Sequence, residues 1–237
     1  MHACKQTTGG CLPRSDASRS AKGSVLRFLA LALLILGLTA CGHTPVTRTV
    51  LDAVGSGRTV DQIQPNPSLR YLRVTVDGRT LLMVLGYVDP ADGGPIETWY
   101  SSAGEVIRIQ GGRIVSTSGL SVDWRAVRYS DLPSWKQMLS LASAQFSRQR
   151  DEMPGYRFGI SQQLDLRPIQ APDKSSLVGL AATDLRWFEE SLRDQPSSLR
   201  SSRYGLRVSN GEPSVVYAQH CLSRDLCLSW QTWPVTP

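Results

Sequence analysis

Residues 69–117 contain short alternating or largely apolar segments between glycine-containing turns, a pattern that strongly favours an antiparallel sheet. Segments 69–76 and 80–88 flank Asp77-Gly78, a dipeptide suited to a type I′ hairpin, in which both central residues need positive φ. In the second of the later segments, Ile107 and Ile109 share one face of the strand. The later segments are 96–100, 105–109 and 113–117. We therefore predict four or five strands here.

Beyond residue 130 the sequence carries both helix and strand signals. Pro133 is predicted to open a helix that Met153-Pro154-Gly155 ends. Its apolar stripe, spaced i, i+3, i+4, i+7 and i+11, consists of Trp135, Met138, Leu139, Ala142 and Phe146. Segment 177–192 fits either a helix or a strand. The strands predicted in this half are 156–167, a hairpin of 204–209 and 214–219, and 226–230.

These elements predict a mainly β fold, an antiparallel meander, barrel-like or sandwich sheet with one or two helices; an α+β fold is the alternative. The expected organisation is a signal peptide over residues 1–40, a lipidated cysteine and tether over 41–68, and a single mostly β periplasmic domain over 69–237. A chain of this length can bury one core.

The only long apolar run of the sequence, residues 28–38, explains the first of these parts. At ~1.5 Å per helical residue it covers roughly half of a ~30 Å hydrocarbon core, which suits the apolar region of a signal peptide. Basic residues precede it, and Leu38-Thr39-Ala40-Cys41-Gly42 follows it. This pentapeptide resembles the bacterial lipobox, in which the cysteine is acylated and becomes the first mature residue. Translation could begin at Met1 or near Val25.

The resemblance to a lipobox implies an anchor at Cys41 and a sorting signal at Gly42. An Asp after the cysteine tends to retain such lipoproteins in the inner membrane, so Gly42 favours the outer membrane. The acylated Cys41 would bind outer-membrane lipid, because each buried CH₂ contributes about 0.8 kcal/mol. The domain is then expected to face the periplasm.

Charge and cysteine content fit an exported protein that does not bind nucleic acid. The whole chain has a formal net charge of +6, which falls to +2 without residues 1–40. A nearly neutral mature chain gives no electrostatic reason to expect a nucleic-acid partner. Two cysteines remain after Cys41, and in an oxidising compartment Cys221 and Cys227 are expected to form a disulfide.

The sequence contains no catalytic string. The mature chain has two histidines, His43 and His220, and lacks the G-x-S-x-G motif of many serine hydrolases. A zinc site from His220, Cys221 and Cys227 would lack a fourth ligand, so the disulfide is favoured and neither metal nor cofactor is expected. The acidic pairs Asp151-Glu152 and Glu189-Glu190 are interpreted as solvated surface charge, with a role as separate glycosidase acid and base as the alternative.

Six tryptophans lie in the mature region, and aromatic rings stack on the apolar faces of sugars. Trp99 and Tyr100 are therefore candidates for glycan contact, although packing in the core explains most tryptophans equally well.

Three strings, in this order after the lipobox, resemble the YjbF/GfcB-type lipoproteins, the group 4 capsule polysaccharide lipoprotein family. They are LLMVLGY at 81–87, WYSSAGEVI at 99–107 and GRIVSTSGL at 112–120. The resemblance implies a mostly β outer-membrane lipoprotein tied to capsule or exopolysaccharide production, and it carries over no catalytic residues. The segment 221–227, with its two cysteines, departs from the pattern.

The favoured function is that of a non-catalytic accessory factor in capsule or exopolysaccharide assembly or export, with polysaccharide or the export machinery as partner. Two alternatives are a periplasmic glycan-modifying enzyme and a structural lipoprotein that supports an outer-membrane β-barrel.

Overall fold

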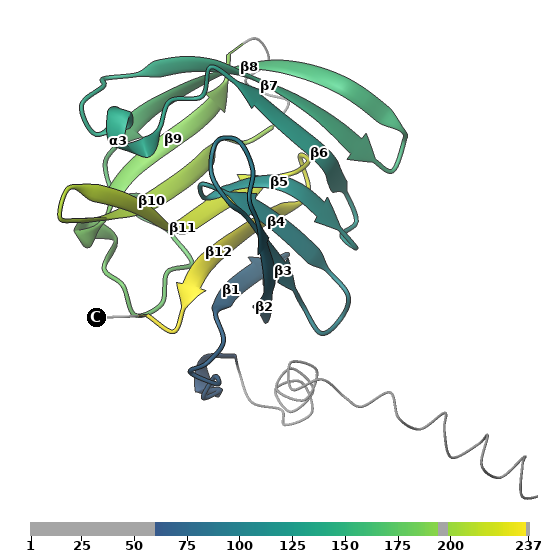
Figure 1. Cartoon of the computed structure of the whole chain (residues 1–237), viewed down its shortest axis with the longest axis vertical. Coiled ribbons are helices and arrows are strands. Elements are labelled where there is room, and N and C mark those ends of the chain that lie inside the picture. The colour runs from purple at the N-terminus through teal and green to yellow at the C-terminus, as the bar shows by residue number, and fades with distance from the viewer. Residues whose placement is uncertain (1–59, 194–198, 236–237) are drawn as a thin grey trace, which may run out of the picture. The chain divides into compact units, whose positions relative to one another are not determined.

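A single antiparallel sheet of two meanders forms the part of the chain that the computed structural model describes, residues 60–193 and 199–235 (Figure 1). A short 3₁₀ turn, η1 (Val60–Gln62), precedes the sheet. The first meander contains β1 (Tyr71–Val76), β2 (Arg79–Asp89), β3 (Ile96–Tyr100), β4 (Val106–Gln110) and β5 (Arg113–Ser118). The second contains β6 (Asp123–Ser130), β7 (Ala144–Met153), β8 (Arg157–Ile169), β9 (Arg186–Leu192), β10 (Ser202–Ser209), β11 (Glu212–Cys221) and β12 (Cys227–Trp233).

The two meanders join where β1 pairs with β12, so that β5 and β6 become the ends of the strand order. These two strands are consecutive in the chain, and side-chain contacts bring them together. The Trp124 amide donates to Thr117 Oγ1 at 3.0 Å, and Ser116 Oγ donates to the Arg125 carbonyl at 2.9 Å. The sheet therefore forms a nearly closed barrel, as the barrel-like alternative predicted.

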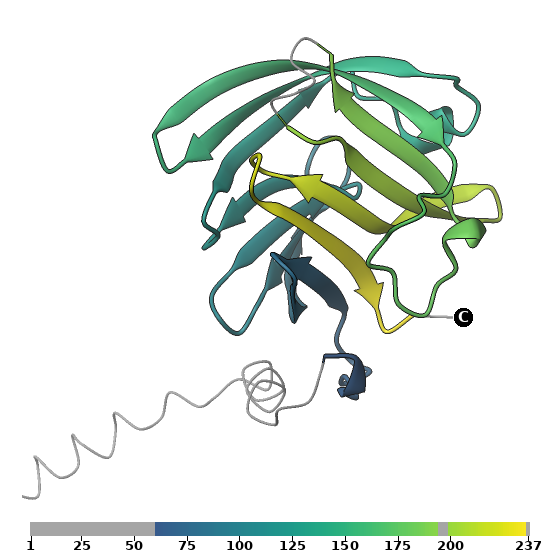
Figure 2. The same cartoon turned by 180° about the vertical axis from the view of Figure 1, so that it is seen from behind.

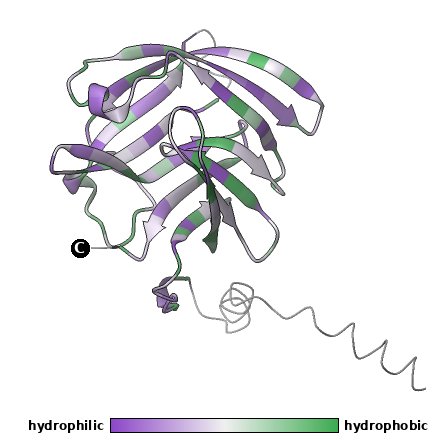
Figure 3. Ribbon diagram, in the orientation of Figure 1, coloured by the Kyte–Doolittle hydropathy of each residue, from purple (hydrophilic) through white to green (hydrophobic). Residues whose placement is uncertain are grey.

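The predicted hairpin at residues 69–88 is confirmed. Asp77 and Gly78 have φ values of 49° and 75°, the positive pair that a type I′ turn needs. Apolar side chains from alternate positions of β1 and β12 fill the interior, among them Val74 and Trp230. Figure 3 shows the resulting alternation of apolar and polar residues along the strands.

The prediction of a helix from Pro133 to residue 150 is wrong. Only α3 (Trp135–Met138) is helical, with Ser134 and Gln137 forming a capping box, and β7 begins at Ala144. Ten residues of β7 pair with β6 on one side and β8 on the other, which satisfies their backbone groups in a sheet instead.

Segment 177–192, for which helix and strand were both open, contains the 3₁₀ turn η2 (Ala182–Asp184) followed by the strand β9. The connection before it, residues 170–181, crosses the outer side of β11 and β12 (Figure 2). Ser176 bonds Ser229 Oγ at 2.5 Å, and Val178 exchanges two hydrogen bonds with the Gln231 side chain. A second, smaller apolar cluster lies beneath this connection.

Among the described residues, no helix has the length and apolar character needed to cross a membrane.

Candidate functional site

Charged side chains gather inside the barrel, where strand alternation directs them. Phe146, Arg148, Arg150 and Glu152 occupy successive inward positions of β7, and all four are buried. The same interior receives Arg113 from β5, Glu190 from β9, Tyr204 from β10 and His220 from β11. We call these residues, without Phe146, the interior polar cluster.

Glu190 is one centre of the interior polar cluster, and its side chain is 1% exposed. It accepts hydrogen bonds from Arg113 Nε at 3.2 Å, from Arg148 Nη1 at 3.3 Å and from the Tyr204 hydroxyl at 3.0 Å. Two guanidinium groups and a phenol thus surround one carboxylate. Buried charges are tolerated in proteins only with such pairing and hydrogen bonding.

A second centre lies nearer one end of the barrel. Gln162 Oε1 accepts from Arg148 Nη2 at 2.7 Å and from Arg150 Nε at 3.2 Å, while Glu152 accepts from both Arg150 and Arg157. The Trp124 ring contacts Arg148 and Arg150, whose guanidinium carbons lie 4.6 and 4.9 Å from the ring centroid. Cation–π contact with Trp124 therefore helps to hold two like charges close together.

Burial changes the ionisation of the groups around Glu190. Burial foremost, and then the Glu190 charge, raises the pKa of Tyr204 well above 10. Burial also lowers the pKa of His220 to about 4, so its imidazole is neutral at neutral pH. Tyr204 and His220 meet edge to face, with ring centroids 5.3 Å apart.

The interpretation of both acidic pairs as solvated surface charge is wrong for one member of each. Glu152 and Glu190 are 4% and 2% exposed, whereas Asp151 and Glu189 point to the outer side of their strands. Sequence reasoning missed the cluster because both faces of β7 carry polar residues. The available signal was the inward row itself, in which a charge follows Phe146 at every second position.

A cavity at the C-terminal end of β12 has a volume of about 660 Å³. Its walls are rich in rings and prolines, and we call it the aromatic cavity. The lining includes Pro65, Asn66, Pro67, Arg70, Tyr71, Trp99, Trp233 and Pro234. The indole nitrogens of Trp99 and Trp233 are buried and have no acceptor within the described residues.

The two aromatic residues proposed for glycan contact lie on opposite faces of β3. Trp99 is 1% exposed and faces the interior beside the aromatic cavity. Tyr100 is 38% exposed on the outer face, where its ring covers Gly86 and lies 6.3 Å from the ring of Tyr87. The structure therefore does not bring Trp99 and Tyr100 together in one groove.

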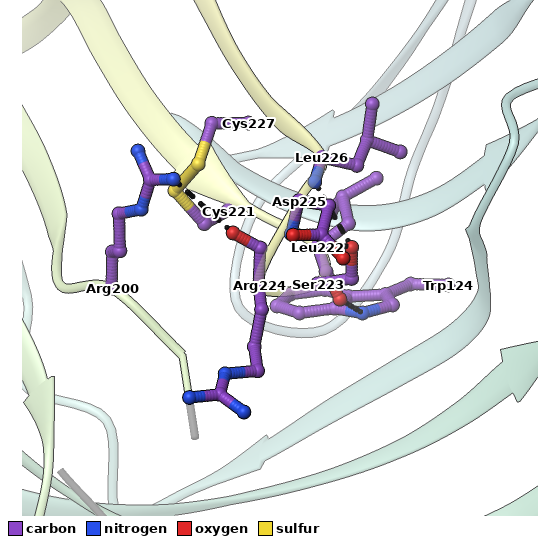
Figure 4. Close-up of a disulfide and its surroundings, with 9 residues drawn as sticks. All are labelled: Trp124, Arg200, Cys221, Leu222, Ser223, Arg224, Asp225, Leu226 and Cys227. Atoms are coloured by element: carbon purple, nitrogen blue, oxygen red, sulfur yellow. Dashed lines mark hydrogen bonds between the residues drawn. A yellow bond between two sulfur atoms is a disulfide. The ribbon is translucent and has the colours of Figure 1, made fainter. Parts of the chain in front are cut away.

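The structure joins Cys221 and Cys227 as a disulfide at the turn between β11 and β12, as the sequence predicted (Figure 4). Trp124 Nε1 donates to the Leu222 carbonyl at 3.0 Å, which ties this turn to the interior polar cluster. Among the described residues no group of His, Cys, Asp and Glu is arranged to hold a metal ion. Cys41 and Gly42 lie outside the described residues.

The fold places the described part of the chain in the class of small, mostly β domains built as antiparallel barrels. Within that class, a family model described as group 4 capsule polysaccharide lipoprotein gfcB, YjbF matches residues 53–199. The chain belongs to this family, as its sequence strings suggested.

A crystal structure of the hypothetical lipoprotein YmcC from Escherichia coli K12 has a similar fold. The TM-score is 0.57 at 17% sequence identity, and the match covers 83% of this chain and 99% of that one. No curated protein is similar to the chain by sequence.

Proposed function

We propose that this protein is a non-catalytic accessory lipoprotein of the outer membrane that acts in capsule or exopolysaccharide assembly or export by binding glycan. The family match over residues 53–199 is the observation that carries the proposal, because the description of that family names capsule polysaccharide. The anchor is the acylated Cys41, and Gly42 directs it to the outer membrane.

The glycan site in this proposal is the aromatic cavity. Its volume of about 660 Å³ falls within the ~300–1,000 Å³ of small-molecule sites. Indole and phenol rings offer apolar faces for sugar rings, and Arg70 and Asn66 offer polar groups at the same wall. A sugar hydroxyl would also supply the acceptor that the indole nitrogens of Trp99 and Trp233 lack.

The test is complementation of a strain that lacks the gene. Trp233→Ala removes a half-buried ring from the aromatic cavity, and Phe158→Ala removes an exposed ring from β8 as the matched control. Trp99→Ala is unsuitable, since emptying a fully buried position costs about 3–5 kcal/mol of stability.

We expect deletion to lower cell-bound or secreted polysaccharide severalfold. Wild type and the Phe158 variant should restore it, whereas the Trp233 variant should not, at equal protein level on an immunoblot. Unchanged polysaccharide in the deletion strain would refute the function. Full restoration by the Trp233 variant would refute the aromatic cavity as its site.

A further inference from the structure

Three arginines line a separate cavity at the opposite end of β12 from the aromatic cavity. It lies between β7, β8 and the disulfide turn, and its volume is about 580 Å³. We call it the arginine cavity. Its lining consists of Arg150, Glu152, Arg157, Ile160, Gln162, Leu199, Leu222, Ser223, Arg224 and Asp225. Three guanidinium groups thus face two carboxylates across one hollow.

Arg150 forms the inner wall of the arginine cavity and is 5% exposed. Its Nε and Nη1 atoms donate to Gln162 and Glu152, and its Nη2 atom has no partner within the described residues. Burial foremost, and then the charges of Arg148 and Arg157, lower the pKa of Arg150 to about 10. A desolvated cation with a free donor therefore faces an open space, which is favourable for an anion.

The other two arginines stand at the rim. The Arg157 side chain is 60% exposed and forms an ion pair with Glu152. Glu152 also forms an ion pair with Arg150. The exposed Arg224 side chain extends away from the disulfide (Figure 4), and its guanidinium has no partner within the described residues. The Glu152 charge is committed to two arginines, so only the exposed Asp225 opposes an incoming anion.

The wall of the arginine cavity is held in place before any ligand arrives. Trp124 stacks on Arg150 and donates to the Leu222 carbonyl, while Ser223 Oγ accepts from the Leu226 amide at 3.0 Å. The disulfide closes the same turn. Such preorganisation reduces the entropy cost of binding.

We propose that the arginine cavity binds an acidic sugar unit through its carboxylate, with Arg150 at the base and Arg157 and Arg224 at the rim. The side-chain oxygen of Gln162 accepts hydrogen bonds from Arg148 and Arg150. The NH₂ group of the same side chain can therefore donate to a sugar hydroxyl. The half-buried Ile160 provides apolar contact for the ring. This site is distinct from the aromatic cavity, and its ligand class does not follow from the proposed function.

The experiment uses the full lipoprotein purified in detergent and isothermal titration calorimetry. The probes are oligogalacturonate, the same oligomer with its carboxyls reduced to alcohols, and glycerol 3-phosphate as a lipid-headgroup probe. Arg157→Gln with Arg224→Gln removes the rim charges and leaves Arg150 in place. Arg128→Gln is the matched control, because Arg128 is exposed on β6 and outside the cavity lining.

We expect the wild type to bind the acidic oligomer at least tenfold more tightly than its reduced form, and more weakly at high salt. The rim variant should lose at least tenfold in affinity at unchanged thermal stability, and the Arg128 variant should bind as wild type. Equal affinity for both oligomers, no binding, or an unaffected rim variant would overturn the proposal. Glycerol 3-phosphate binding as tightly as the acidic oligomer would assign the cavity to headgroups instead and also overturn it.

The polysaccharide phenotype of the deletion strain is independent of these titrations. A deletion phenotype without binding of the acidic oligomer would leave the proposed function intact and refute only this site.

Discussion

At the residue scale, Glu189 and Glu190 show how one position along a strand changes the role of a carboxylate. Glu190→Gln leaves Arg113 and Arg148 buried with a neutral partner, and breaking a buried ion pair costs about 3–5 kcal/mol. Glu189 pairs with the exposed Arg167 and Arg203 on the outer face, so Glu189→Gln should cost under about 1 kcal/mol. Urea denaturation of both variants measures the difference. Equal losses would contradict the inward orientation of Glu190.

His220 should make the stability of the protein depend on pH. Its pKa is lowered to about 4, so between pH 4 and 6.5 the unfolded chain binds more protons at this histidine than the native protein does. The contribution of His220 to the free energy of unfolding is therefore fully present above about pH 6.5. It decreases as the pH falls towards 4, by up to about 3 kcal/mol in total. Glu190, Arg113, Arg148 and Tyr204 are the titratable groups around it.

The measurement compares wild type with His220→Gln by urea denaturation at pH 4.5 and pH 7. We expect the variant to lose less stability than the wild type across this interval. Parallel curves would show that His220 is not a buried neutral group.

At the scale of elements, regular alternation made most strands predictable, and its interruptions explain the errors. β1 alternates cleanly and β2 is largely apolar; both flank Asp77-Gly78 and were predicted almost to the residue. β6 was not predicted, because a register shift between Trp124 and Ala126 breaks its alternation. The interior polar cluster was missed because the pairing of β7 with β6 and β8 decides which of its two polar faces is buried. In the sequence of β7, the charges at every second position after Phe146 were the one signal for it.

The disulfide turn is an element whose removal should affect one site more than the fold. Cys221 and Cys227 are six positions apart, and chain entropy gives about 2 kcal/mol for so short a loop. Cys221→Ser with Cys227→Ser should therefore weaken oligogalacturonate binding by releasing Arg224 and Asp225, while the barrel stays folded. Far-UV circular dichroism and the calorimetric titration test this together. Unchanged affinity would mean that the turn is held without the disulfide.

At the scale of the whole molecule, the aromatic cavity and the arginine cavity lie at opposite ends of β12. β12 carries Trp233 of the aromatic cavity at its end, and the disulfide turn that lines the arginine cavity precedes its start. The N-terminal chain enters the domain beside the aromatic cavity, since residues 63–67 line it. The two cavities are therefore on different ends of the barrel and can be varied independently.

The anchor decides whether a domain of this kind acts at a membrane. We expect Cys41 to carry lipid, because the apolar run 28–38 and the pentapeptide ending in Gly42 have the form of a lipoprotein signal. Each buried CH₂ contributes about 0.8 kcal/mol to membrane binding. One acyl chain therefore binds a protein to the membrane only marginally, whereas two or three chains anchor it firmly. Growth with a palmitate analogue should label the wild type and Cys11→Ala, the matched control in the predicted signal peptide, but not Cys41→Ala. Equal labelling of the Cys41 variant would refute the anchor.

Sorting provides the last test, because it separates the anchor from its destination. Gly42→Asp keeps Cys41 and should remain labelled, yet it should move the protein from the outer-membrane to the inner-membrane fraction on a sucrose gradient. If the site of action is the outer membrane, polysaccharide output should fall with this relocation although the barrel and both cavities are unchanged. A relocated protein that restores full output would show that the choice of membrane does not matter for this function. A Gly42 variant that stays in the outer-membrane fraction would remove the sequence basis for that location.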